Sequence, residues 1–144
     1  LFMKSFLIII VFLLSLFSGS VFAKTVEVEM LNRSGKNIMV FSKRIVNVNS
    51  GDNIFWKATD KGHNVEFVTV PDGVKGFKSK LGKDANYTFS KPGVYLYQCT
   101  PHKMMGMIGI VVVDNNYNNL DLVKKTKMIG KSKKILKQLT KELK

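Results

Sequence analysis

The sequence predicts a mainly β fold, in which a β-sandwich of seven or eight short strands is followed by two C-terminal α-helices. Between residues 24 and 114, short runs rich in β-branched and aromatic residues alternate with turn clusters of Gly, Pro, Asn and Asp. This spacing is typical of a sandwich. After Asp114 the apolar residues recur at helical spacing instead. The length of 144 residues suits one such domain.

The first 23 residues have the pattern of a secretory signal. Lys4 precedes an apolar run over residues 6–17, which only Ser15 interrupts, and small residues lead to Ala23. A positive start, a short apolar stretch and a small residue before the cut predict cleavage after Ala23. The run is shorter than the roughly 20 residues that a spanning helix needs, which disfavours the alternative of an uncleaved membrane anchor. We therefore expect the mature chain to begin at Lys24.

The strands of the predicted sandwich are short and end at recognisable turns. In the first, Val26, Val28 and Met30 alternate with more polar neighbours, the period of a half-buried strand. Turn clusters lie at 49–52 and 71–73, and 91–93 reads as a hairpin-type turn. The predicted strands cover residues 26–31, 38–41, 45–48, 53–56, 65–70, 87–89, 94–99 and 108–113.

Residues 115–144 predict a helical extension of the sandwich domain, which covers residues 24–114. A polar linker over 115–119 leads into a helix from Leu120 to about Met128, and Gly130 breaks it. A second helix is expected from Ser132, as N-cap, to Leu143, with its apolar residues on one face. We expect the two helices to pack on the sandwich. The alternative is a basic amphipathic tail that lies on an anionic membrane.

The chain is strongly basic, with a formal net charge of +13 and a pI near 9.9. Removal of residues 1–23, whose single charged residue is Lys4, lowers the charge to +12. Such a charge suits a nucleic-acid binder, but the export signal and the lack of a recognition motif oppose that class. Most of the lysines are expected to form a solvated surface.

Metal-ligating side chains are few and lie at the ends of predicted strands. The chain has one cysteine, Cys99, and two histidines, His63 and His102, with several methionines just beyond. A single cysteine in an exported chain cannot form an intramolecular disulfide, so metal ligation is its natural explanation. A Cys/His2 set with a weak Met ligand is the chemistry of an electron-transfer copper site. Zinc suits the same donors, whereas a thiol enzyme lacks any evident substrate-pocket pattern.

Two segments carry a resemblance to a known family. Residues 60–66, Asp-Lys-Gly-His-Asn-Val-Glu, and residues 99–107, Cys-Thr-Pro-His-Lys-Met-Met-Gly-Met, closely resemble those of the pseudoazurins, which are bacterial periplasmic cupredoxins. The similarity extends over nearly the whole mature chain. It implies a Greek-key cupredoxin β-sandwich with two C-terminal helices, and a periplasmic type 1 (blue) copper protein that carries one electron between Cu(I) and Cu(II).

The resemblance also implies the ligands of the copper ion. Carried over by position, they are His63, Cys99, His102 and Met107. Met105 is the alternative fourth ligand, because its distance from His102 matches the shorter loop of amicyanin-like proteins. Asn64 resembles the family asparagine that ties the two ligand loops together, a role that fixes ligand geometry.

The same resemblance suggests a docking face around His102. It implies an apolar patch formed by Met39, Pro101, Met104 and Met105. Around it lie basic residues at positions that match the family's docking lysines, namely Arg33, Lys61, Lys78 and Lys103. The implied partner is an acidic periplasmic redox protein, such as a copper nitrite reductase or a c-type cytochrome. We expect a monomeric electron carrier that is neither an enzyme nor inserted in a membrane after cleavage. The alternative function is a copper chaperone or storage protein.

Overall fold

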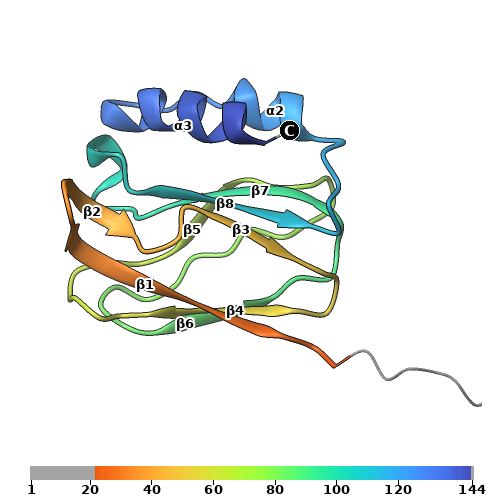
Figure 1. Ribbon diagram of the computed structural model, residues 1–144, viewed down its shortest axis with the longest axis horizontal. Helices are drawn as coiled ribbons and strands as arrows, with labels where there is room; N and C mark the ends of the chain where they lie inside the picture. Colours follow the sequence, from red (N-terminus) through yellow and green to blue (C-terminus); the bar gives the residue numbers. More distant parts are fainter. Residues whose placement is uncertain (1–21, 144) are drawn as a thin grey trace, which may run out of the picture.

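The structure is a computed structural model that describes residues 22–143. Apart from Phe22 and Ala23, the predicted signal lies outside these residues. Two four-stranded β-sheets pack face to face, and two helices form a third layer on one of them (Figure 1). The predicted Greek-key cupredoxin fold with two C-terminal helices is confirmed. No helix between residues 22 and 143 has the length and apolar character needed to cross a bilayer.

The first sheet has the strand order β2-β1-β4-β6 and the second the order β3-β8-β7-β5. Two pairs are parallel, β1 with β4 and β3 with β8, and the remaining neighbours are antiparallel. The strands are β1 Thr25–Ser34, β2 Asn37–Phe41, β3 Ile45–Val48, β4 Asn53–Lys57, β5 Glu66–Thr69, β6 Ala85–Thr88, β7 Gly93–Gln98 and β8 Ile108–Val113.

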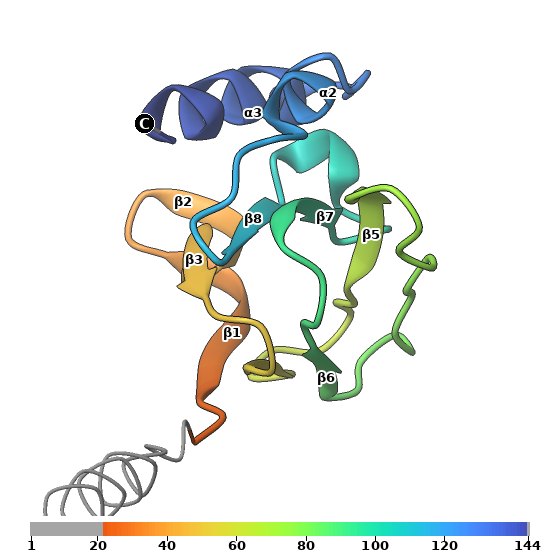
Figure 2. The ribbon, with the colours of Figure 1, turned by 90° about the vertical axis from the view of Figure 1, so that its right-hand side faces the viewer.

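All eight predicted strands are present, and β3 and β8 have the predicted bounds. The hairpin-type turn at residues 91–93 was a wrong prediction. β6 pairs with β4 in the first sheet, whereas β7 pairs with β5 and β8 in the second. The segment between β6 and β7 therefore crosses from one sheet to the other (Figure 2). Turn residues mark a change of direction without specifying which strands pair on either side.

Strands β7 and β8 are buried on both faces because they lie in the middle layer of three. Tyr95 and Tyr97 of β7 point into the core between the sheets, and Val94 and Leu96 pack in a second core beneath the helices. This two-sided burial explains why these strands read as continuous apolar runs while β1 alternates. It also makes them the best-anchored part of the scaffold.

A glycine in β8 makes room for the largest side chain of β7. Gly109 lies opposite Tyr97 in the antiparallel register. A Cβ at this glycine would lie 2.3 Å from Cζ of that tyrosine. The ring is fully buried and packs edge-on against Phe41 and Trp56, with centroid distances of 4.8 and 5.4 Å. The position therefore requires glycine for space.

The helices are α2, Leu120–Lys124, and α3, Lys131–Glu142, and both cover the outer face of the second sheet (Figure 1). Four apolar residues of the predicted stripe are buried there, namely Ile135, Leu136, Leu139 and Leu143. The stripe stabilises the fold, so the alternative in which it lies on a membrane does not hold for this structure.

Two details of the helices differ from the sequence prediction. The first helix ends at Lys124 rather than near Met128. The second has Gly130, with φ +57°, as its N-cap residue, and no side chain caps it. Ser132 lies inside the helix, fully buried, and its hydroxyl donates to the carbonyl oxygen of Lys103. A tertiary contact has replaced the local capping role that serine usually takes.

Candidate metal centre

Paired strands bring the predicted donors together at one end of the sandwich. Cys99 directly follows β7, and His63 lies in the loop before β5. These strands are neighbours in the second sheet, with Glu66 opposite Gln98. The register thus places the residue after one strand beside the loop before the other. His102 reaches the same point through a tight turn, in which its N–H donates to the carbonyl oxygen of Cys99 at 3.2 Å.

Three of the predicted donor atoms converge at this end. Sγ of Cys99 lies 3.7 Å from Nδ1 of His63 and 3.5 Å from Nδ1 of His102. The two Nδ1 atoms are 3.1 Å apart. All the donor atoms of this cluster lie within 4.8 Å of one another, close enough to bind a single ion. His63 and Cys99 are fully buried, whereas His102 is partly exposed.

The methionines of the ligand loop, residues 99–107, differ sharply in burial. Met107 is fully buried, and its carbonyl oxygen accepts a 2.9 Å hydrogen bond from the N–H of Cys99. Gly106, with φ +90°, makes the turn immediately before it. By contrast, 61% of Met104 is exposed, and Met105 is partly exposed. This burial favours Met107 over Met105 as the fourth ligand, and its ligation stays a prediction.

The electrostatics of the cluster suit a metal cation. Burial lowers the pKa of His63, and the neighbouring His102 lowers it further; burial also lowers the pKa of His102. Both rings are therefore neutral at pH 7, with nitrogen lone pairs free to bind a metal. Burial raises the pKa of the Cys99 thiol, against smaller opposite effects of the Asn64 and His102 backbones. A bound cation would reverse this preference and hold the thiolate. The donors present fit a copper ion.

Asn64 joins the two ligand loops, as the resemblance implied. Its Oδ1 accepts from the N–H of Thr100 at 2.8 Å, and its Nδ2 donates to the hydroxyl oxygen of Thr100 at 2.9 Å. The Thr100 hydroxyl in turn donates to Glu66 at 2.7 Å. Because Asn64 follows His63 and Thr100 follows Cys99, this pair of bonds fixes the separation of two donors.

Asn32 orients the buried histidine, a role that the sequence reasoning missed. Nε2 of His63 lies 2.8 Å from Oδ1 of Asn32 on β1. An N–H on Nε2 that donates to this amide oxygen leaves Nδ1 unprotonated and facing Cys99. Histidines that bind metals usually donate their other ring N–H in this way. The sequence gave no local signal, because Asn32 is 31 residues away from the ring that it contacts.

The start of α3 supports the ligand loop from outside. Ser132 is hydrogen-bonded to the carbonyl of Lys103, and a Cβ on Gly130 would lie 2.5 Å from the carbonyl oxygen of Met104. A Cβ on Gly106 would in turn lie 3.2 Å from Ile135. The two backbones thus approach as closely as glycine allows, so the helix restricts the positions open to the loop.

A Cys/His2 cluster at one end of a two-sheet Greek-key sandwich defines the class of small copper proteins called cupredoxins. The family of copper binding proteins described as the plastocyanin/azurin family matches residues 28–114. The chain is 44% identical to the pseudoazurin of Paracoccus pantotrophus over 114 residues, which cover 78% of this chain and 79% of that protein. It is 43% identical to the pseudoazurin of Methylorubrum extorquens, over 71% of this chain and 70% of that protein.

Solved structures agree with these relatives. The crystal structure of the pseudoazurin of Methylobacterium extorquens superimposes with a TM-score of 0.80 at 38% identity, covering 83% of this chain and 99% of that one. A pseudoazurin from Hyphomicrobium denitrificans gives a TM-score of 0.78 at 36% identity, covering 82% and 97%. The chain belongs to the pseudoazurin family of blue copper electron-transfer proteins, and copper is its cofactor.

Proposed function

We propose that His63, Cys99, His102 and Met107 hold one type 1 copper ion, and that the chain carries single electrons between proteins of the periplasm. The observation that carries this proposal is the convergence of three soft and borderline donors within 4.8 Å at one end of the sandwich. When bound, copper supplies a one-electron couple between Cu(I) and Cu(II). The signal pattern of residues 1–23 supports export to the periplasm.

The protein's part is to hold the donors in one arrangement. Asn32 fixes the ring of His63, and Asn64 fixes the separation of the two ligand loops. The start of α3 supports the loop that carries His102. Because these contacts exist without the ion, the ligands need little rearrangement when its charge changes. Such preorganised surroundings favour rapid electron transfer.

His102 is the proposed exit for the electron, because it is the only one of the three clustered donor residues that is not fully buried. Exposed apolar side chains lie next to it in the chain, with Pro101 exposed and Met104 61% exposed. Leu81, which the sequence reasoning missed, is 60% exposed and lines a shallow hollow together with Pro101. An apolar contact of this kind allows close approach of a partner to the ring.

Basic residues surround this apolar area and suit an acidic partner. Lys61 and Lys103 are exposed beside the two histidines in the chain, and Arg33 is exposed beside Asn32. Lys78 is exposed but lies 3.7 Å from Glu66, which offsets part of its charge. A positive rim speeds encounter with an acidic surface and makes the rate depend on salt. A copper nitrite reductase or a c-type cytochrome in the periplasm fits this description, and a monomer leaves the surface free.

Copper titration tests the site. Cu(II) added to the chain that begins at Lys24 should give one equivalent of an intense blue or green colour, which dithionite bleaches. Met107→Leu should shift the absorption bands and the reduction potential, while the control Met105→Leu should leave both nearly unchanged. A colourless product, or the reverse behaviour of the two methionine variants, would contradict the ligand assignment. Preferential retention of zinc in a competition experiment would contradict the assigned metal.

Charge neutralisation tests the docking surface. Lys61→Gln with Lys103→Gln should slow electron transfer to an acidic partner about tenfold at low salt and little at high salt, because the charges act on the rate of encounter. The control Lys43→Gln with Lys75→Gln removes the same charge elsewhere. Equal rates for both double variants would refute the docking surface. Rapid transfer of copper itself to a metal-free acceptor would favour the chaperone function instead.

A further inference from the structure

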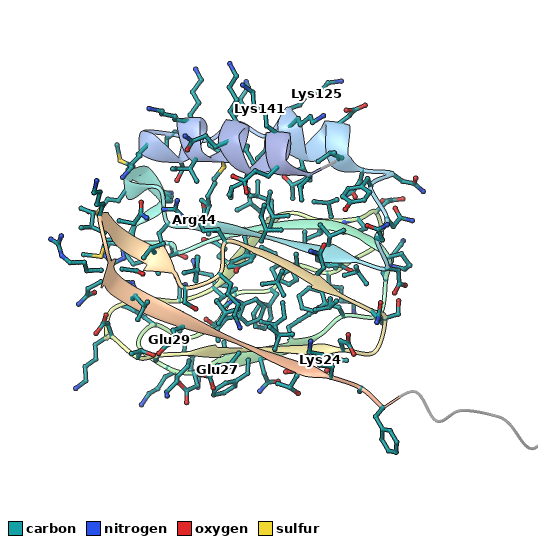
Figure 3. All side chains as sticks on the ribbon, viewed as in Figure 1. Lys24, Glu27, Glu29, Arg44, Lys125 and Lys141 are labelled. Carbon is teal, nitrogen blue, oxygen red and sulfur yellow. The ribbon has the colours of Figure 1, made fainter. Side chains whose placement is uncertain are left out.

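The outer surface of the two helices is densely basic. Residues 120–143 contain eight lysines, all exposed, and only two acidic residues, Asp121 and Glu142. We call these lysines the helical lysine surface; they are Lys124, Lys125, Lys127, Lys131, Lys133, Lys134, Lys137 and Lys141. The side chains of α2 and α3 extend away from the sandwich, as the labelled Lys125 and Lys141 show (Figure 3). Glu27 and Glu29 lie on the opposite side of the molecule.

These charges have no protein partner within the described chain. The ion pair found among residues 22–143 joins Lys78 to Glu66 and involves no lysine of the helices. Glu142 instead acts on Arg44 of the sandwich, whose pKa it raises against the larger lowering effect of burial. The packing of the helices needs only their apolar stripe, so it does not explain why the outer surface carries lysine at so many positions.

The surface also has an apolar floor. Six of the eight lysines line a groove of about 910 Å³ between the helices, whose floor includes Met128, Ile129 and Leu136. Ile129 is 47% exposed between the helices. No acidic residue lines the groove. Lysine stems that lie along apolar surface, with their ammonium groups at the rim, are the arrangement that proteins use at the boundary between water and lipid.

We propose that the helical lysine surface adsorbs this protein to a bilayer of anionic phospholipids, without insertion. Flexible lysines spread along a helix about 18 Å long match many phosphate groups in a plane better than one recessed anion. Each lysine near such a surface strengthens binding additively, and salt screens the attraction. The apolar stripe of α3 remains buried in the protein, so Ile129 supplies only a shallow apolar contact.

The arrangement of layers keeps the copper end free in this orientation. The helices form a layer parallel to the sheets, whereas η1, Lys103–Met105, lies at the end of the strands (Figure 1). A bilayer against the helices would leave the surface around His102 facing along the membrane. The protein would then meet membrane-bound redox partners by lateral diffusion in two dimensions. The two basic areas thus have separate tasks.

Vesicle binding tests this inference. The chain from Lys24, which contains every described strand and helix, should co-sediment with phosphatidylcholine vesicles that contain about one third phosphatidylglycerol, and not with phosphatidylcholine alone. Lys125→Gln, Lys137→Gln and Lys141→Gln together should weaken binding about a hundredfold at low salt, from about fivefold for each lysine. The charge-matched control, with Lys24, Lys43 and Lys75 changed to Gln, should stay within about threefold of the parent.

Three results would overturn the inference: no binding to the anionic vesicles, equal binding to neutral vesicles, or equal loss in the two triple variants. Binding of an acidic protein by the helical lysine surface, without vesicle binding, would also overturn it, in favour of a protein partner. Lys61→Gln with Lys103→Gln should slow electron transfer but leave vesicle binding within about threefold. Because vesicle binding needs no redox partner, its failure would leave the proposed electron carrier intact.

Discussion

Replacement of Asn64 by alanine should loosen the copper site by separating its two ligand loops. The Asn64 side chain is only 3% exposed and makes two short hydrogen bonds to Thr100, at 2.8 and 2.9 Å. Alanine removes both and leaves the N–H of Thr100 without its acceptor. The Thr100 hydroxyl retains its bond to Glu66, so the damage is confined to the connection between the loops.

The size of the effect follows from these contacts. Each lost hydrogen bond costs about 1 kcal/mol net, and a buried donor without a partner adds about 1–3 kcal/mol. We therefore expect Asn64→Ala to lower the free energy of unfolding of the metal-free protein by about 3 kcal/mol. Because the same contacts fix His63 relative to Cys99, copper affinity should fall about 10- to 100-fold.

Urea unfolding of the metal-free protein and competition for copper with a chelator measure the two effects. Asn53→Ala is the matched control, because its side chain donates one exposed hydrogen bond of 3.1 Å to Thr88. We expect that control to cost less than about 1 kcal/mol and to leave copper affinity unchanged. If the two variants prove equally stable, the connection between the loops does not contribute as the structure implies.

Three further changes test other parts of the structure. Gly109→Ala should destabilise the fold by about 2 kcal/mol or more, because its Cβ would overlap Tyr97; an unchanged urea midpoint contradicts this. Gly130→Ala, at φ +57° and against the ligand loop, should shift the visible spectrum of the Cu(II) protein; an unchanged spectrum argues against support by α3. The hydrogen bond from Thr100 lowers the pKa of Glu66. Its carboxylate therefore stabilises the fold above the ordinary value near 4.5, and this stabilisation is lost as the pH falls through the lowered pKa. Glu66→Gln should remove that acid-dependent loss, and parallel curves of stability against pH would refute the assignment.

The strands and the donor residues could be predicted from the sequence because their signals are local. Period-2 alternation located β1, and continuous apolar runs located β7 and β8. The chain offers one cysteine and two histidines, so the candidate donors were few. Their placement at strand ends was enough to suggest a shared site, and the structure brings all three together.

Interactions between distant segments escaped prediction because no local pattern encodes them. The pairing of β6 with β4 rather than β7 depends on which sheet each strand joins. Ser132 looked like an N-cap, but a contact with Lys103, 29 residues earlier, takes its hydroxyl. The contact of Asn32 with His63 likewise appears only after β1 and the loop before β5 lie together. Propensity describes each segment alone, and tertiary contacts decide the outcome.

The close contact between α3 and the ligand loop has a consequence for protein engineering. The loop meets Gly130, Ser132 and Ile135 of a segment that lies beyond the last strand. A loop grafted from a cupredoxin without C-terminal helices would arrive with a shape never selected to fit that neighbour. Such a chimera should need compensating changes at the beginning of the helix, so in this scaffold the loop is not a portable module.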